Sequence, residues 1–376
     1  MALISNGAVD IQKRPKINSL SGLKVIAMFL LFWQHGPMPS PGGCDLGART
    51  CEFFFVCSGF LVAYNYYGKN VPQTWSESIR YSSVKLANMW PLHFIAFVVV
   101  CFSIPLQTLL SKKMALTAVL NLGLVQSWSP NSDVFFSFNG ASWFLSSLLF
   151  CYFLAPFFLK FSKHIKQSLI LFVFIFALRF ALEWIPTISP VTFWDVNVHV
   201  SPIIRSLEFF MGLLICPLFI YAQRQINKLK DDKKHSAALI AVFTAIEIAV
   251  LSLVVLLSLK KNQIWLRAEF VILFCLVVFI FAFDGGLCSK IFGSKPFLFL
   301  SSIQFEFYIL HQAVIKMLGR PIARLLHSWQ FESVALAAII LILALLYNRF
   351  LSKKCTRLMK KTFNFLFKTF DFNISI

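Results

Sequence analysis

The chain has 376 residues, of which 58% are hydrophobic, 16% aromatic and only 14% charged. Soluble domains typically contain about 25% charged residues, so the composition excludes a soluble protein and predicts a polytopic membrane protein. The net charge of +19 does not indicate a nucleic-acid partner, because the basic residues concentrate in short loops between apolar segments.

Apolar segments follow one another along almost the whole chain. They predict an all-α transmembrane helix bundle with about ten spans and no soluble domain. The predicted spans cover residues 19–35, 52–67, 90–109, 142–160, 167–185, 205–222, 237–259, 264–283, 303–318 and 332–351. The run 114–128, at about 15 residues, is too short for a span. We expect it to lie at the interface or to re-enter.

The segments that flank the apolar region are polar and basic. We divide the chain into a cytoplasmic N-terminal segment (1–18), a transmembrane domain (19–352) and a basic cytoplasmic tail (353–376). The tail is expected to rest on the anionic inner leaflet. With ten spans, the basic cluster at 224–235 and both termini lie in the cytoplasm, as the positive-inside rule requires. Counting 114–128 as a further span would place that cluster outside, so the charges favour ten.

The first two predicted spans contain ionisable groups that are costly inside a bilayer. Lys24, His35 and Glu52 are of this kind, and such groups are usually functional. Lys24 and His35 are 11 residues apart, which places both on one helix face with about 16 Å between them along the axis. This spacing suits a long substrate that reaches from the membrane edge to a buried base.

Several motifs in this order resemble the acyltransferase-3 family of integral-membrane acyltransferases. The family has a basic residue separated by ten residues from a histidine in its first helix, and an acidic-x-Phe-Phe-x-x-Ser-Gly-Phe signature in its second. The corresponding residues here are Lys24 and His35, Glu52 to Phe60, Trp90 to His93, Phe138 to Ser146, Arg205-x-x-Glu208-Phe209, and Glu306-x-Tyr308-x-x-His311. The resemblance covers about 300 residues.

Two positions depart from the family pattern. Lys24 stands where the family usually has Arg, and Lys85-x-x-Asn88 replaces an Arg-x-x-Arg. A lysine ammonium acts as a point charge and lacks the bidentate fork of Arg. Both changes bear on how tightly a coenzyme is bound.

The resemblance implies transfer of an acetyl group from acetyl-CoA to a hydroxyl of a cell-envelope glycan, in the bacterial inner membrane. Removal of the hydroxyl proton needs a base of near-neutral pKa, which we assign to His35. Glu52 is the candidate that orients His35, or else a structural partner of Lys or Arg on a neighbouring helix. Lys24 and Lys85 are expected at the phosphates of acetyl-CoA, or as snorkelling interfacial lysines.

Ser58 is grouped with Lys24 and Lys85 on the coenzyme side. A covalent acyl-serine is disfavoured because no nucleophile elbow surrounds Ser58, and a Ser-Gly pair also permits close helix approach. On the acceptor side we place Asn139, Ser142, Trp143, Glu208, Tyr308 and His311. The first three also fit an interfacial tryptophan with a helix cap. Gln304, Tyr308 and His311 form a helical stripe that lines either a cavity or a packing seam.

The sequence therefore predicts a membrane O-acetyltransferase that uses acetyl-CoA and no metal. Its expected partners are a glycan acceptor and the lipid bilayer. Since the chain ends at Ile376 without an appended acceptor domain, the acetyl group is expected to pass either directly to the acceptor or to a separate extracytoplasmic protein. The alternative is a transporter or flippase of a glycan or lipid-linked intermediate, although no internal repeat of the kind many transporters contain is evident.

Overall fold

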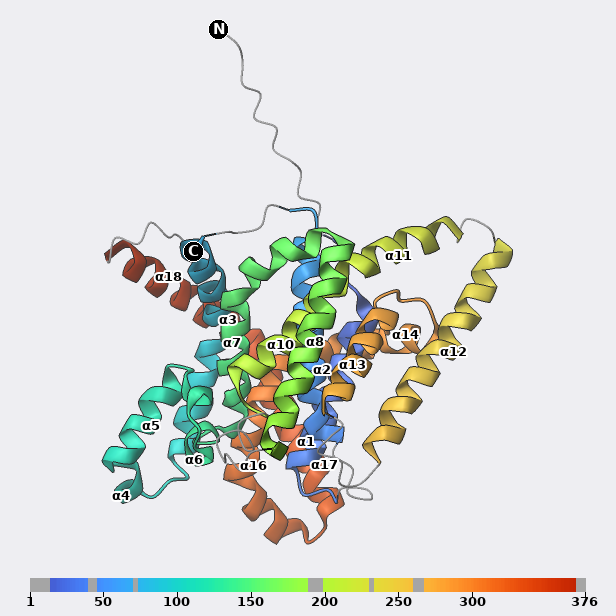
Figure 1. Cartoon of the computed structure of the whole chain (residues 1–376). Coiled ribbons are helices and arrows are strands. Elements are labelled where there is room, and N and C mark those ends of the chain that lie inside the picture. Colours follow the sequence, from blue (N-terminus) through green and yellow to red (C-terminus); the bar gives the residue numbers. More distant parts are fainter. Residues whose placement is uncertain are drawn as a thin grey trace.

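The computed structural model describes residues 14–39, 46–69, 74–188, 199–229, 233–259 and 267–369. Within these ranges the secondary structure is entirely helical. The described chain begins and ends at the same end of the bundle, where α11 and α18 also lie (Figure 1). We call this the terminal end. The opposite end, where α4 to α6 lie, is the distal end.

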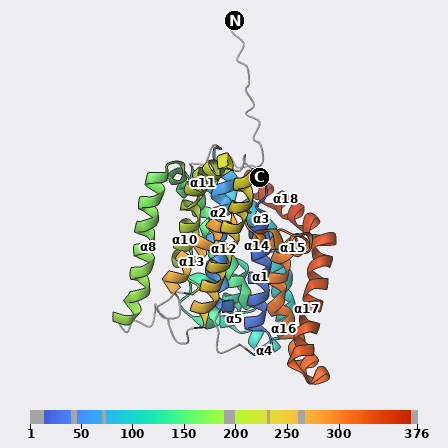
Figure 2. The ribbon, with the colours of Figure 1, turned by 90° about the vertical axis from the view of Figure 1, so that its right-hand side faces the viewer.

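Long helices build the bundle, most of them running between its two ends, whereas α11 lies along the terminal end (Figure 1). They are α1 (Asn18–His35), α2 (Leu46–Tyr66), α3 (Trp75–Cys101), α7 (Trp143–Leu159), α8 (Ile165–Ile188), α10 (Pro202–Leu214), α11 (Cys216–Leu229), α12 (Lys233–Ser258), α13 (Arg267–Phe281), α16 (Gln304–Leu326) and α17 (Trp329–Leu346). Viewed from the side, α8 and α17 form opposite edges of the bundle, with α1, α2, α10 and α13 between them (Figure 2).

Shorter elements connect the long helices. They are α4 (Leu106–Leu109), α5 (Lys112–Leu122), η2 (Gln126–Trp128), α6 (Ser132–Phe135), η3 (Gly140–Ser142), η4 (Lys160–Lys163), α14 (Leu287–Phe292) and α15 (Lys295–Ser301). A π-helical stretch, Tyr347–Ser352, joins α17 to α18 (Lys353–Thr369). The predicted basic tail is thus largely helical within the described residues. Residues 1–13 and 370–376 lie outside the described ranges.

Six helices of the described chain are long and apolar enough to cross a membrane, or seven if the bent pair α15 and α16 forms one span. The predicted count of about ten is therefore not confirmed. The segments predicted at 19–35 and 52–67 correspond to α1 and α2, which are not among the six, and the one at 264–283 corresponds to the shorter apolar helix α13. Polar residues such as Lys24 and Gln34 lower the mean hydropathy of α1.

The predicted bounds of the third span, 90–109, are wrong. Helix α3 begins at Trp75, because Thr74 and Glu77 form a capping box at its N-terminus. It ends at Cys101, shortly before Pro105. Lys85 is consequently a helical residue and not part of a cytoplasmic loop. The doubtful run 114–128 forms the short helix α5 and the turn η2 at the distal end (Figure 1).

Glycines bring α2 and α10 into backbone contact at the centre of the bundle. A Cβ on Gly59 would overlap the carbonyl oxygen of Phe209, and a Cβ on Gly212 would overlap that of Val56. Any larger residue at either position would separate the two helices. Gly59 follows Ser58 in the second motif, so this motif lies where it fixes the central helix pair.

Candidate active site

Two histidines of the motifs, one on α1 and one on α16, meet in the structure. His35 is the last residue of α1, and His311 lies on α16. Nδ1 of His35 is 3.0 Å from Nε2 of His311, and the two rings stack with centroids 5.1 Å apart. His311 is buried, whereas His35 is exposed. One histidine therefore supports the other from inside the bundle.

The partners of the two rings define their tautomers. Nδ1 of His311 contacts the backbone carbonyl oxygen of Tyr308, which can only accept a hydrogen bond, so this nitrogen has the proton. Nε2 of His311 is then an acceptor, and Nδ1 of His35 donates to it. The remaining nitrogen of His35, Nε2, has a free lone pair. This atom is the candidate general base of the site.

Aromatic rings from three motifs surround the histidine pair. The ring of Tyr308 lies 5.7 Å from His311, 5.3 Å from Phe144 and 6.4 Å from Phe54. The hydroxyl of Tyr308 donates to the carbonyl oxygen of Ala141 at 2.8 Å. Tyr308 is therefore part of the wall beside His311, as the predicted helical stripe required, and it is anchored on the segment before α7.

Asn139 and Ser142, predicted at the acceptor side, form hydrogen bonds within the protein. Nδ2 of Asn139 donates to the carbonyl oxygen of Ile309 at 2.9 Å. The hydroxyl of Ser142 accepts from Nε2 of Gln126 at 3.1 Å. Both contacts fix the segment around η3 against neighbouring elements. Oδ1 of Asn139 is buried and has no hydrogen-bond partner among the described residues, so it is available as an acceptor.

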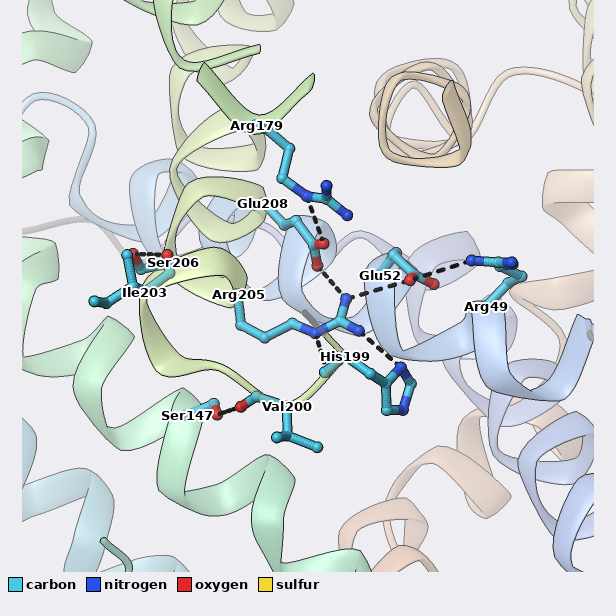
Figure 3. A network of polar contacts seen from close by, with 10 residues as sticks. All are labelled: Arg49, Glu52, Ser147, Arg179, His199, Val200, Ile203, Arg205, Ser206 and Glu208. Carbon is cyan, nitrogen blue, oxygen red and sulfur yellow. Dashed lines mark hydrogen bonds and ion pairs between the residues drawn. The ribbon is translucent and has the colours of Figure 1, made fainter. Parts of the chain in front are cut away.

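Four buried charged residues form a continuous chain through the bundle core (Figure 3). Arg205 donates to Glu208 at 2.6 Å and lies 3.3 Å from Glu52, while Arg179 donates to Glu208 at 3.3 Å. None of the four is more than 1% exposed. The chain joins α2, α8 and α10. We call these four residues the charge network.

Two further side chains complete the surroundings of Arg205. Its Nε donates to the carbonyl oxygen of His199 at 2.6 Å, and its Nη2 donates to Nδ1 of the same residue at 3.0 Å. The guanidinium lies 5.7 Å from the ring centroid of Trp143, and the Trp143 ring is 4.9 Å from that of His199. Trp143 thus packs against the charge network, and this contact accounts for its burial.

The predicted contact between Glu52 and His35 is wrong. Glu52 pairs with Arg205 and, at 3.9 Å, with Arg49, whereas His35 pairs with His311. Glu208, predicted to bind the acceptor, is fully buried, and both of its carboxylate oxygens have arginine partners. A buried carboxylate is costly without a cation. Glu52 is accordingly paired with Arg205, and Glu208 with both Arg205 and Arg179.

Sequence reasoning missed two members of the charge network. Arg179 is a lone charge within the predicted span 167–185, and such a residue almost always faces the bundle interior. Arg205 and Glu208 are three positions apart on a helix, which is the spacing of an intrahelical ion pair. Both signals were present in the sequence. The sequence left open a pairing of Glu52 with Lys or Arg on a neighbouring helix, and the structure selects Arg205 on α10.

The three predicted coenzyme-side residues lie around the terminal half of α2. Lys24 lies near Cys57, the neighbour of Ser58. Ser58 lies near Tyr152 on α7. The ammonium of Lys85 lies 5.0 Å from the ring centroid of the same tyrosine. Tyr152 therefore links Ser58 to Lys85.

Comparisons with known proteins agree with the motifs. The acyltransferase-3 family model, described as an acyltransferase domain, matches residues 17–349. A curated relative, acyltransferase MdmB from Streptomyces mycarofaciens, is 33% identical over 104 residues, which is 27% of this chain and 25% of that protein. The match to MdmB thus covers about a quarter of each protein, and no solved structure matches the chain. Because the family model covers most of the sequence, the chain belongs to the acyltransferase-3 family of membrane acyltransferases.

Proposed function

We propose that this protein is a membrane O-acyltransferase that moves an acetyl group from acetyl-CoA to a hydroxyl of a cell-envelope glycan. The observation that carries the proposal is the His35–His311 pair, which leaves Nε2 of His35 free to accept a proton. A neutral imidazole is suited to this task near physiological pH. Membership of an acyltransferase family favours this activity over the transporter alternative, which no finding supports.

In the proposed reaction, Nε2 of His35 takes the proton of the acceptor hydroxyl as the oxygen attacks the thioester carbonyl carbon. The new C–O bond forms first, and collapse of the tetrahedral intermediate then breaks the C–S bond. The imidazolium of His35 returns the proton to the departing sulfur, so the base is regenerated. His311 accepts the Nδ1–H bond throughout. It thereby keeps the ring in the reactive tautomer and orientation.

The donor is proposed to enter from the terminal end, with the acceptor at the distal end. Lys24 precedes His35 by 11 residues on α1, or about 16 Å along the axis. Lys24, Lys85 and Ser58 are assigned to the coenzyme side of this path. The terminal end is then cytoplasmic and contains both termini, and the membrane is the bacterial inner membrane. A glycan, or a separate extracytoplasmic protein that passes the acetyl group on, is the proposed acceptor.

The decisive experiment compares His35→Ala with the wild type in nanodiscs. Release of free CoA thiol from acetyl-CoA, with and without an envelope glycan fraction as acceptor, measures the reaction. We expect no acceptor-dependent release from His35→Ala, at an unchanged yield of folded protein. His327→Asn is the matched control, because His327 lies at the C-cap of α16 in a left-handed conformation that Asn tolerates. A wild-type rate in His35→Ala would refute the proposed base.

A further inference from the structure

Two adjoining cavities open at the terminal end of the bundle, between the end of α2, the start of α8 and the middle of α11. Their volumes are about 570 and 360 Å³. They share Tyr67 and Lys163 in their linings. We call them together the basic cleft.

Cations and aromatic rings are prominent among the side chains that line the basic cleft. Cations come from Lys69, Lys163, Lys166 and Arg224, and no carboxylate occurs among the described lining residues. The rings of Tyr66, Tyr67 and Tyr221 supply aromatic faces. Helix α8 begins at Ile165 inside the lining, so the positive end of its macrodipole adds to the cations. Cations beside aromatic faces match a phosphorylated nucleoside, with charge for the phosphate and rings for the base.

Aromatic contacts connect the basic cleft to the coenzyme-side residues. The ring of Tyr66, in the cleft, lies 5.7 Å from that of Tyr81 on α3. Tyr81 lies 6.1 Å from Tyr152, and the ammonium of Lys85 lies 5.3 Å from the Tyr81 ring. Tyr152 in turn lies near Ser58. A continuous row of side chains thus leads from the cleft into the bundle.

We propose that the basic cleft binds the 3′-phosphoadenosine end of a CoA thioester. This inference rests on the proposed function and extends it, because it assigns a site to the nucleotide end of the donor, which is remote from the sulfur. A Cβ on Gly47 of α2 would contact Gln34, the neighbour of His35 on α1. Gly47 therefore lies at about the same depth in the bundle as the proposed base. Tyr67 is 20 residues further, or about 30 Å along the helix. The thioester at His35 and the nucleotide at Tyr67 therefore use the whole depth of α2, with Lys24 and Lys85 between them for the diphosphate.

The proposal is tested by equilibrium binding of adenosine 3′,5′-bisphosphate to the full chain in phosphatidylcholine nanodiscs. We expect Lys163→Gln and Arg224→Gln each to weaken binding at least tenfold. Lys228→Gln is the matched control, because it removes the same charge one turn further along α11 at an exposed position outside the cleft lining. Adenosine 5′-monophosphate, which lacks the 3′-phosphate, is expected to bind weakly to all four proteins. Unchanged bisphosphate binding by both cleft variants would overturn the proposal.

Two further arms separate this proposal from its alternatives. Nanodiscs with added phosphatidylglycerol test a lipid headgroup, and loss of bisphosphate binding there through competition at the cleft would assign the cleft to lipid and overturn the proposal. Kinetics separate it from the proposed function. Cleft variants should raise the KM for acetyl-CoA at least tenfold and leave turnover of S-acetylpantetheine, which lacks the nucleotide, unchanged. If the wild type turns over neither thioester, the proposed function fails, while the binding assay still decides whether the cleft takes the nucleotide.

Discussion

The His35–His311 pair and the charge network both contain ionisable residues of the family motifs, yet they differ in exposure and in pairing. The histidine pair lies at a helix end, has one exposed member and leaves one nitrogen free. The charge network is buried and joins its cations to its carboxylates. Both carboxylate oxygens of Glu208 have arginine partners, so Glu208 has no capacity left for a substrate, whereas Oε2 of Glu52 has no hydrogen-bond partner among the described residues. Motif residues inside a membrane therefore divide into reactive and architectural groups by their partners.

Breaking the charge network should have the largest effect, and it should act on folding. Arg205→Met leaves Glu52 and Glu208 without their shared cation in the core. Removal of one partner of a buried ion pair typically costs about 3–5 kcal/mol. We expect little folded protein by size-exclusion chromatography and circular dichroism. Arg320→Met, at an exposed position on α16, is the control. A stable but inactive Arg205→Met protein would instead show that Arg205 takes part in the reaction.

Substitution of His311 should lower activity and leave folding intact. His311→Leu removes the acceptor for Nδ1–H of His35, so we expect kcat to fall about 100-fold with folded protein retained. His311→Gln offers an amide oxygen in place of Nε2, and it should recover much of the loss. Measurement of kcat and KM for the three proteins checks this. Equal activity of the Leu and Gln variants would exclude a positioning role for the side chain at 311.

A third buried group, Glu247 on α12, tests whether a lone carboxylate without an arginine is also architectural. It accepts from the backbone N–H groups of Gly286 at 3.0 Å and Ser289 at 3.2 Å, and from the Ser289 hydroxyl. These bonds attach α12, at the edge of the bundle in Figure 1, to α14. We expect Glu247→Gln to lower the free energy of unfolding by about 1–3 kcal/mol. Thermal unfolding in detergent measures it, and activity below the unfolding temperature should not change.

The sequence was sufficient to predict an all-helical membrane protein, its family and the helix face shared by Lys24 and His35. The fold and the shared helix face depend on composition and on spacing within one helix, whereas the family was inferred from a resemblance of several motifs in order along the chain. It was not sufficient for the partners of Glu52, because Arg49, Arg205 and His35 were all plausible and only the packing of α2 against α10 selects among them. The start of α3 was missed for a different reason. Its first turns are polar, and a hydropathy pattern cannot detect a helix that extends beyond the apolar segment.

The number of membrane spans also shows a limit of hydropathy patterns. Helix α1 falls below the apolarity expected of a span because it contains Lys24, Gln34 and His35. A threshold on hydropathy therefore fails at the helix that ends in the proposed base.

The smallest effect is expected from substitution of Lys24. This substitution tests coenzyme binding separately from the His35–His311 pair and the charge network. Lys24 is half-buried near Cys57, where the family has Arg. A guanidinium bonds phosphate through two N–H groups where an ammonium acts as a point charge. We expect Lys24→Arg to lower the KM for acetyl-CoA about two- to threefold, with kcat and thermal stability unchanged, because neither His35 nor the charge network contacts this position. Steady-state kinetics over a range of acetyl-CoA concentrations measure both constants, with Lys24→Gln expected to shift KM in the opposite direction. A change in kcat without a change in KM would place Lys24 at the reacting atoms and remove it from the path of the coenzyme.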